Sequence, residues 1–210
     1  EKKLALENLR FFLKDMNIHL DQYSILFTIL CFLIFINAFN MFDGINGQSG
    51  VYTLLIFLFF ILNNFQIFFS IIMIICCLFF IYFNIRNKIF LGDNGSLIIS
   101  FIISVLIINF YNETKNLFCE EIFILMMLPG IDMARLFVER IIKGKNPLKA
   151  DKNHFHHLLL KKFKQKEVLI INFLFILIPI ILMILNVNYT LIIALFSVIY
   201  FFILYKLKFL

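Results

Sequence analysis

Residues 44–85 read GINGQSGVYTLLIFLFFILNNFQIFFSIIMIICCLFFIYFNI and contain no Asp, Glu, Lys or Arg. A helix needs roughly 20 residues to cross a hydrocarbon core of about 30 Å, so this run is too long for one crossing. Asn63-Asn64 divides it into two predicted spans. Because lipid offers the backbone no hydrogen-bond partners and the apolar residues do not alternate with polar ones, the pattern predicts helices rather than barrel strands.

The rest of the chain has the same character. Its 210 residues are 62% hydrophobic and 15% charged, whereas water-soluble domains contain about 25% charged residues. The sequence predicts an all-α, polytopic integral membrane helical bundle with about seven transmembrane helices. We expect one transmembrane domain over residues 24–210, with loops at 40–50, 84–96 and 139–167. The predicted spans are residues 24–39, 51–62, 65–83, 97–111, 122–138, 168–185 and 189–205.

The distribution of basic residues predicts the orientation of these spans. If the loop at 139–167 lies inside, the other two loops lie inside as well, and Lys115 is the one basic residue placed outside after residue 40. The positive-inside rule then assigns the three loops to the cytoplasm. The net charge of +6 is concentrated in the loop at 139–167, so we expect no nucleic-acid partner. The basic residues on the inside are Arg86, Lys88, Arg135, Arg140, Lys143, Lys145, Lys149, Lys152, Lys161, Lys162, Lys164, Lys166, Lys206 and Lys208.

Residues 1–23 do not fit this orientation. The chain changes side with each span, which places these residues outside, and yet they contain several basic side chains. Two interpretations remain open. Apolar residues at roughly helical spacing predict an interfacial amphipathic helix, whereas a first residue that is Glu1 rather than Met favours the remnant of a truncated span. The apolar positions are Leu6, Leu9, Phe12, Leu13 and Met16.

Three polar segments interrupt the apolar runs. The first contains Asn37, Asn40 and Asp43, which are three residues apart and therefore share one face of a helix. A carboxylate between two spans usually faces a bundle interior or a wet cavity. This segment predicts either part of a ligand site or a polar seam between helices.

The second polar segment, FLGDNGS at Phe90–Ser96, opens directly into an apolar span. Ser96 or Asn94 is expected to cap that helix, whose free N–H groups favour an anion such as phosphate. Asp93 is suited to Mg²⁺, which uses one or two carboxylates together with substrate phosphates. The alternative is a capped helix start in which Asp93 complements the helix dipole.

The third polar segment carries His154, His156 and His157, close in sequence to Arg140 and several lysines. Histidine is a common zinc ligand, but no cysteine lies nearby, and the aspartates of the other segments suit Mg²⁺ better. Histidines among lysines also suit phosphate, to which they act as charged hydrogen-bond donors. The alternative is a basic loop attracted to anionic lipid headgroups.

Taken together, the three segments resemble one family. NAFNMFDGINGQSG (Asn37–Gly50), FLGDNGS (Phe90–Ser96) and LPGIDMARLFVERIIKGKNPLKADKNHFHHLLL (Leu128–Leu160) are similar to motifs of the polyprenyl-phosphate N-acetylhexosamine-1-phosphate transferases of glycosyltransferase family 4. The motifs occur in the order of the family, and the resemblance covers about residues 25–165. It implies an enzyme that initiates a cell-envelope glycan.

The resemblance implies transfer of a sugar 1-phosphate from a UDP-N-acetylhexosamine to a polyprenyl (undecaprenyl) phosphate, with release of UMP. It implies Mg²⁺ as cofactor, with Mn²⁺ as an alternative, a bacterial inner-membrane location and a site that faces the cytoplasm. Monomer and homodimer remain open. The implied catalytic residues are Asp43, Asp93 and His156, with Asp93 as the metal ligand. The implied substrate-binding residues are Asn40, Asn46, Arg140, His154 and His157.

The chain departs from the family pattern at two points. Asn46 stands where the family has a second Asp, so an acid–base role at this position is in doubt, although an amide can still accept a hydrogen bond. The family also has an adjacent Asp pair upstream, and this sequence contains none. We therefore expect the isolated 210 residues to be inactive, as a fragment or a degenerate copy.

Other classes of membrane protein fit less well. A transporter predicts polar residues near the middle of the spans, and a di-iron oxidase built on histidine clusters needs about twice the four histidines present. A CDP-alcohol phosphotransferase needs Ala-Arg soon after Asp-Gly, whereas Asp43-Gly44 is followed by Ile-Asn-Gly-Gln. A transporter and a non-catalytic membrane scaffold remain the alternatives.

Overall fold

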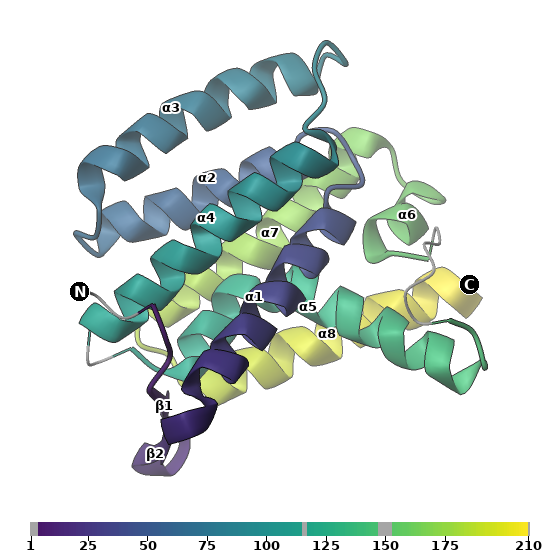
Figure 1. Ribbon diagram of the computed structural model, residues 1–210. Helices are drawn as coiled ribbons and strands as arrows, with labels where there is room; N and C mark the ends of the chain where they lie inside the picture. Colours follow the sequence, from purple (N-terminus) through teal and green to yellow (C-terminus); the bar gives the residue numbers. More distant parts are fainter. Residues whose placement is uncertain (1–3, 115–116, 147–152, 210) are drawn as a thin grey trace.

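The computed structural model describes residues 4–114, 117–146 and 153–209. An N-terminal hairpin is followed by a bundle of helices (Figure 1). The hairpin consists of β1 (Asn8–Phe11) and β2 (Met16–His19), with short 3-10 turns at Leu13–Asp15 and Asp21–Tyr23. The helices are α1 (Ser24–Phe42), α2 (Gln48–Leu62), α3 (Ile67–Asn84), α4 (Gly92–Glu113), α5 (Cys119–Ile142), α6 (Phe155–Leu160), α7 (Gln165–Ile184) and α8 (Tyr189–Phe209).

Each of the seven predicted spans coincides with a helix, and the prediction of an all-α polytopic membrane protein is confirmed. Within the described residues, five helices are long and apolar enough to cross a membrane: α1 with the turn before it, α3, α4, α7 and α8. Helix α2 is apolar but shorter. Helix α5 is long, and it carries Glu120, Glu121, Asp132, Arg135 and Glu139 among its apolar residues.

The N-terminal segment differs from the predicted helix. Residues 8–19 form an antiparallel hairpin with Leu9 opposite Ile18. Partners elsewhere in the chain satisfy its extended backbone, since the Phe12 N–H donates to Glu120 Oε2 at 3.0 Å and the Arg10 N–H donates to the Tyr111 hydroxyl at 2.6 Å. The prediction of an amphipathic helix is wrong, because these tertiary contacts override the local spacing of apolar residues.

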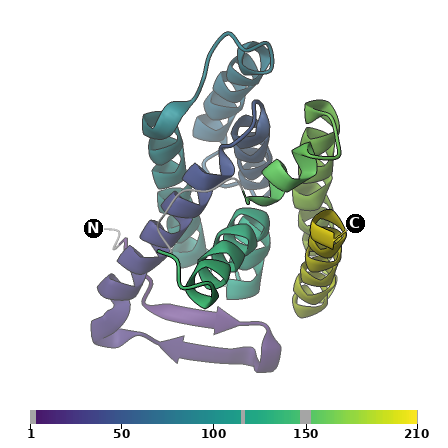
Figure 2. The same ribbon diagram turned by 90° about the vertical axis from the view of Figure 1, so that its right-hand side faces the viewer.

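Helix α5 lies inside the bundle and contacts α1, α7 and α8, while α1 also packs on α4 and α2 packs on α3 and α7 (Figures 1 and 2). The core is rich in aromatic rings, among them Phe39, Tyr52, Phe57 and Phe60, all fully buried. Large apolar side chains of α3, among them Phe68, Ile75 and Phe79, are exposed, as expected for a helix that faces lipid.

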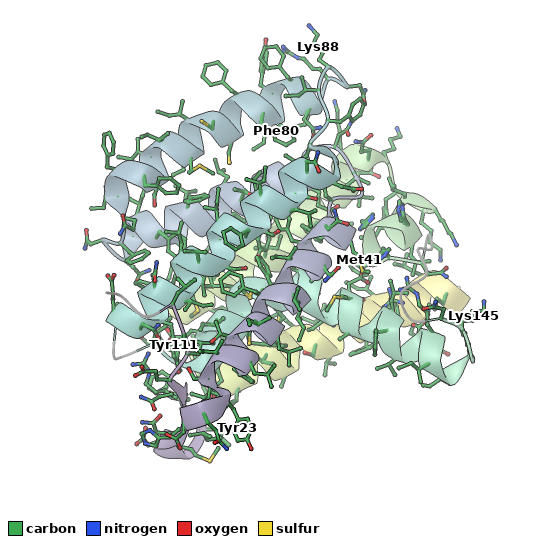
Figure 3. The ribbon with its side chains drawn as sticks, viewed as in Figure 1. Tyr23, Met41, Phe80, Lys88, Tyr111 and Lys145 are labelled. Atoms are coloured by element: carbon green, nitrogen blue, oxygen red, sulfur yellow. The ribbon has the colours of Figure 1, made fainter. Side chains whose placement is uncertain are left out.

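The three polar segments lie at one end of the bundle. The C-terminal end of α1, the start of α4 and the segment around α6 all lie on the right-hand or upper right-hand side of Figure 1. In Figure 3, Met41, Lys88 and Lys145 lie toward this end, whereas Tyr23 and Tyr111 lie at the other. The predicted placement of the segments at a common end is confirmed, and its assignment to the cytoplasm stays a prediction.

Candidate active site

Asn40 joins the first polar segment to the second. It lies in the last turn of α1, and its amide Nδ2 donates to Ser96 Oγ at 2.7 Å and to Asp93 Oδ1 at 3.3 Å. Ser96 is buried in the interface between α1 and α4. This contact fixes Asp93 next to the end of α1, although the two segments are more than 50 residues apart in the sequence.

Asp93 lies in the first turn of α4 and is exposed. The helix begins at Gly92, whose φ of +65° favours glycine. The prediction that Asn94 or Ser96 caps this helix is wrong, because both lie within it; the Ser96 hydroxyl instead donates to the Asp93 carbonyl at 3.0 Å. The Asp93 carboxylate complements the positive end of the helix dipole and remains open to a ligand.

Asp43 follows directly after α1 and is half-buried. Burial raises the pKa of its carboxyl, the neighbouring Ser49 hydroxyl lowers it, and the negative charge of Asp93 raises it. The two carboxylates are therefore close enough to repel each other. A cation placed beside both would remove this repulsion, because opposite charges favour the ionised form.

The turn after Asp43 is held by Asn84, the last residue of α3, and by Asn87 in the loop that follows. Asn46 Nδ2 donates to Asn87 Oδ1 at 2.5 Å, and the Gly47 N–H donates to the buried Asn84 Oδ1 at 2.5 Å. Gly47 has a φ of +87°, which allows the chain to turn into α2. One N–H of the Asn46 amide is therefore engaged by the loop after α3. The role of Asn46 in nucleotide binding stays a prediction.

A further pair of buried polar residues supports the same turn and was not predicted. Gln48 Nε2 donates to the Phe42 carbonyl at 2.8 Å, and Asn172 of α7 donates through Nδ2 to Gln48 Oε1 at 3.1 Å. Both side chains are buried. The signal available in the sequence was an asparagine inside an otherwise apolar span, where polar residues are uncommon without a partner.

The third polar segment reaches the first through His156 and Gly44. His156 lies in α6, and a Cβ built on Gly44 would come within 1.9 Å of His156 Nε2. Only glycine therefore allows the ring to pack on this turn. The side chain is 2% exposed, and its Nε2 has no hydrogen-bond partner among the described residues. A buried nitrogen without a partner is a candidate contact for a ligand.

The protonation of His156 is set mainly by its burial. Burial and, to a lesser extent, the nearby His157 lower the pKa of His156 to about 3, so this ring is neutral near pH 7. Its ring centroid is 4.3 Å from that of His157, which is half-buried. The low pKa therefore disfavours the charged form that the sequence predicts for His156, and the phosphate contacts of the three histidines stay a prediction.

His154 is buried and one of its ring nitrogens is already engaged. Its Nδ1 lies 2.9 Å from Asp132 Oδ2, and its ring stacks on His156 with centroids 5.6 Å apart and an interplanar angle of 9°. Asp132 was not among the site residues predicted from the sequence. A predicted phosphate contact by His154 would use its other nitrogen.

Arg140 is buried in the last turn of α5, whereas the sequence placed it in the predicted loop at 139–167. Its predicted role in phosphate binding stays a prediction. Some of the basic residues used to predict the orientation of the spans lie outside the described residues. These are Lys115, Lys149 and Lys152, together with Lys2 and Lys3 of the N-terminal segment.

The carboxylates at this end fit the coordination habits of magnesium better than those of zinc, and the cofactor itself stays a prediction. Among the described residues, no group of three or more His, Cys, Asp or Glu side chains is arranged to hold a metal ion. Structural zinc sites use four protein ligands and catalytic ones three, whereas Mg²⁺ commonly uses one or two carboxylates and takes further ligands from phosphates and water. The Asp43 and Asp93 carboxylates match the second pattern.

Comparison with known proteins identifies the family. The model of glycosyl transferase family 4 matches residues 2–111, which include the first two polar segments. This chain belongs to glycosyl transferase family 4. The family resemblance predicted from the three motifs is therefore confirmed, and the chain is a member of a family of transferases.

Individual relatives in family 4 extend the match over most of the chain. The undecaprenyl-phosphate alpha-N-acetylglucosaminyl 1-phosphate transferase of Escherichia coli K12 is 29% identical over 171 residues, which are 76% of this chain and 47% of that protein. The decaprenyl-phosphate N-acetylglucosaminephosphotransferase of Mycolicibacterium smegmatis is 31% identical over 170 residues, 68% of this chain and 42% of that protein. The family 4 chain thus spans about half the length of the curated relatives it matches.

Proposed function

We propose that this family 4 chain takes part in transferring an N-acetylhexosamine 1-phosphate from a UDP-sugar to a polyprenyl (undecaprenyl) phosphate, with release of UMP, as the first step of a cell-envelope glycan such as lipopolysaccharide or cell wall. The names of the relatives support an N-acetylglucosamine phosphate and a polyprenyl phosphate as substrates. The UDP donor follows from the family resemblance.

One observation carries this proposal: the three motifs meet at one end of the bundle. Asn40 bonds Asp93 across α1 and α4, and His156 packs on Gly44 next to Asp43. A transporter would instead gather such residues near the middle of the spans. A site at the end of a helical bundle suits a reaction in which one substrate is embedded in lipid and the other is dissolved in water.

The chemistry needs positioning and charge neutralisation more than covalent participation by the protein. Asp93, with Asp43 beside it, would hold Mg²⁺, or alternatively Mn²⁺, at the transferring phosphates. The bound ion supplies neutralisation of the charge that develops there. His156 presents an unpartnered Nε2 beside Asp43, where it can hydrogen-bond a phosphate oxygen. Arg140, Asn46, His154 and His157 are proposed substrate contacts.

The distribution of basic residues supports a cytoplasmic position for the site. Described basic residues such as Arg86, Lys88, Lys143, Lys161 and Lys206 belong to loops and helix ends that lie with the site. Under the positive-inside rule this end faces the cytoplasm, where nucleotide sugars are found. We propose a multi-pass protein of the bacterial inner membrane whose site opens to the cytoplasm.

The test compares two carboxylates of α4. Asp93→Asn removes a negative charge at the site, and Glu113→Gln removes one at the opposite end of the same helix. We expect Mg²⁺-dependent binding of UDP-N-acetylglucosamine by the purified protein to be lost in Asp93→Asn and kept in Glu113→Gln. Because the 210 residues alone lack the adjacent Asp pair and are expected to be inactive, UMP release is measured with the chain joined to an upstream segment that carries this pair, and it should follow the same order. Mg²⁺-dependent binding and turnover at wild-type levels in Asp93→Asn would refute the assignment.

A further inference from the structure

Asp132 is the centre of a buried polar network beside the candidate site. It lies on α5 and is 4% exposed. Its Oδ1 accepts hydrogen bonds from Arg135 Nη2 at 2.7 Å, from the Tyr200 hydroxyl at 2.7 Å and from the Phe155 N–H at 3.0 Å. Its Oδ2 lies 2.9 Å from His154 Nδ1. Three helices and the segment before α6 thus converge on one carboxylate.

This arrangement determines which nitrogen of His154 carries a proton. An ionised carboxylate can only accept hydrogen bonds, and the guanidinium of Arg135 at 2.7 Å stabilises the ionised form of Asp132. The bond between Asp132 Oδ2 and His154 Nδ1 therefore requires a proton on Nδ1. A neutral His154 then keeps its acceptor lone pair on Nε2.

The same carboxylate also fixes where the histidines lie. The Phe155 N–H, which Asp132 holds, belongs to the first residue of α6, and Arg135 donates to the Asn153 carbonyl at 2.8 Å just before it. His154 stacks on His156, and His156 packs on Gly44. A continuous chain of contacts therefore runs from Asp132 to the turn that carries Asp43.

We propose that Asp132 is a positioning residue that fixes the Nδ1–H tautomer of His154 and the start of α6, and so holds His156 against Gly44 beside the two aspartates. Its effect on turnover rests on the proposed function. Its effect on the histidines does not, so the two can be tested separately.

Asp132→Asn provides a sharp structural test, because the network dictates how the new amide must lie. Three donors point at the position of Oδ1, so the amide oxygen is expected there. The amide NH₂ then occupies the position of Oδ2 and faces His154 Nδ1, which has to become an acceptor. We expect the proton of His154 to move from Nδ1 to Nε2.

The measurement is ¹⁵N NMR of histidine-labelled protein in detergent, which distinguishes protonated from unprotonated ring nitrogens, with signals assigned by single histidine substitutions. The matched control is Glu139→Gln, which removes another carboxylate that Arg135 bonds, at 2.9 Å, without a bond to His154. We expect Nδ1–H in wild type and in the control, and Nε2–H in Asp132→Asn together with shifted His156 signals. A wild-type His154 with its proton on Nε2 alone, or unchanged signals in Asp132→Asn, would overturn the proposal.

Turnover separates positioning from a purely structural role. In membranes that contain the chain joined to an upstream segment with the family's adjacent Asp pair, we expect kcat for UMP release from UDP-N-acetylglucosamine to fall at least tenfold in Asp132→Asn below that of Glu139→Gln, with a smaller change in KM. Equal kcat values in the two variants would overturn the positioning role, even with the tautomer inverted. An absence of turnover in wild type and both variants would refute the proposed function, and the NMR result would still decide the inference about Asp132.

Discussion

Two aspartates at the same end of the bundle have opposite surroundings. Asp132 is buried and accepts hydrogen bonds from Arg135, Tyr200, His154 and a backbone N–H. Asp93 is exposed, and within the described residues its side chain accepts a long hydrogen bond from Asn40, at 3.3 Å. A carboxylate whose oxygens are filled by protein donors holds structure, whereas one with open oxygens retains capacity for a ligand.

The contrast extends to the neighbouring charges. Asp132 is paired with a guanidinium at 2.7 Å, while Asp93 has the like charge of Asp43 nearby. The pairing of Asp132 with Arg135 is favourable within the protein itself. The neighbouring negative charges of Asp93 and Asp43 repel each other unless a cation binds beside them. Substitutions at Asp132 should therefore mainly lower the stability of the fold, whereas substitutions at Asp93 should mainly weaken ligand binding.

The largest effect on stability is expected from Asp132→Ala. This change leaves the buried Arg135 without its closest carboxylate, and breaking a buried ion pair typically costs about 3–5 kcal/mol. We expect a much lower midpoint of thermal denaturation in detergent. Glu139→Ala is the control, because its carboxylate is a quarter exposed and partly exposed pairs contribute about 0–1 kcal/mol. Equal shifts in the two variants would show that the buried Asp132 pair contributes no more to stability than the partly exposed Glu139 pair.

The next largest effect is expected at Gly44, where the two regions touch. A Cβ in Gly44→Ala would lie 1.9 Å from His156 Nε2, so the ring must move, and overpacking typically costs about 1–3 kcal/mol. Gly130→Ala in α5 is the control, since a Cβ there meets nothing within 4 Å and Ala stabilises a helix by roughly 0.5–1 kcal/mol relative to Gly. Thermal denaturation should shift in opposite directions in the two variants.

His156 adds a smaller effect that depends on pH. Its pKa is about 3 in the folded chain and about 6.5 when exposed, so unfolding below pH 6.5 takes up a proton. Stability that is present above pH 6.5 is therefore lost as the pH falls toward 3, by up to about 1.4 kcal/mol per pH unit. The thermal midpoint of wild type should fall more steeply from pH 7 to pH 5 than that of His156→Gln.

His19→Gln serves as the control for this measurement, because it removes a histidine from the exposed hairpin. We expect its pH dependence to match that of wild type. If His156→Gln also kept the full slope, His156 would not be the buried neutral ring described here.

The features that the sequence predicted correctly are local or follow from counting spans. Charge-free runs such as residues 44–85 predict helices because each residue must satisfy its backbone within a segment. Because successive spans run in opposite directions, counting them predicts that Asn40, Asp93 and His156 lie at one end of the bundle. Both arguments need only the order of residues along the chain.

The features that were missed depend on contacts between distant residues. Asp132 meets Tyr200, 68 positions away, and Gln48 meets Asn172, 124 positions away, and the hairpin depends on Tyr111 and Glu120. No pattern within a window of the sequence encodes these pairs. The available signal was the type of residue, since an Asp three residues before an Arg in an apolar span indicates a buried pair.

Asp93→Asn should have the smallest effect on stability and the largest on ligand binding. The exposed side chain contributes a favourable charge at the start of α4, and losing it is expected to cost about 0.3–1 kcal/mol. The amide keeps the shape of the carboxylate but is a much weaker ligand for Mg²⁺. Thermal denaturation with and without Mg²⁺ and UDP-N-acetylglucosamine measures both properties in one experiment. We expect the ligands to raise the midpoint of wild type and of Glu113→Gln but not that of Asp93→Asn. A ligand-induced shift in Asp93→Asn as large as in wild type would show that the open carboxylate is not where the metal binds, and Asp43 would then be the remaining acidic candidate beside His156.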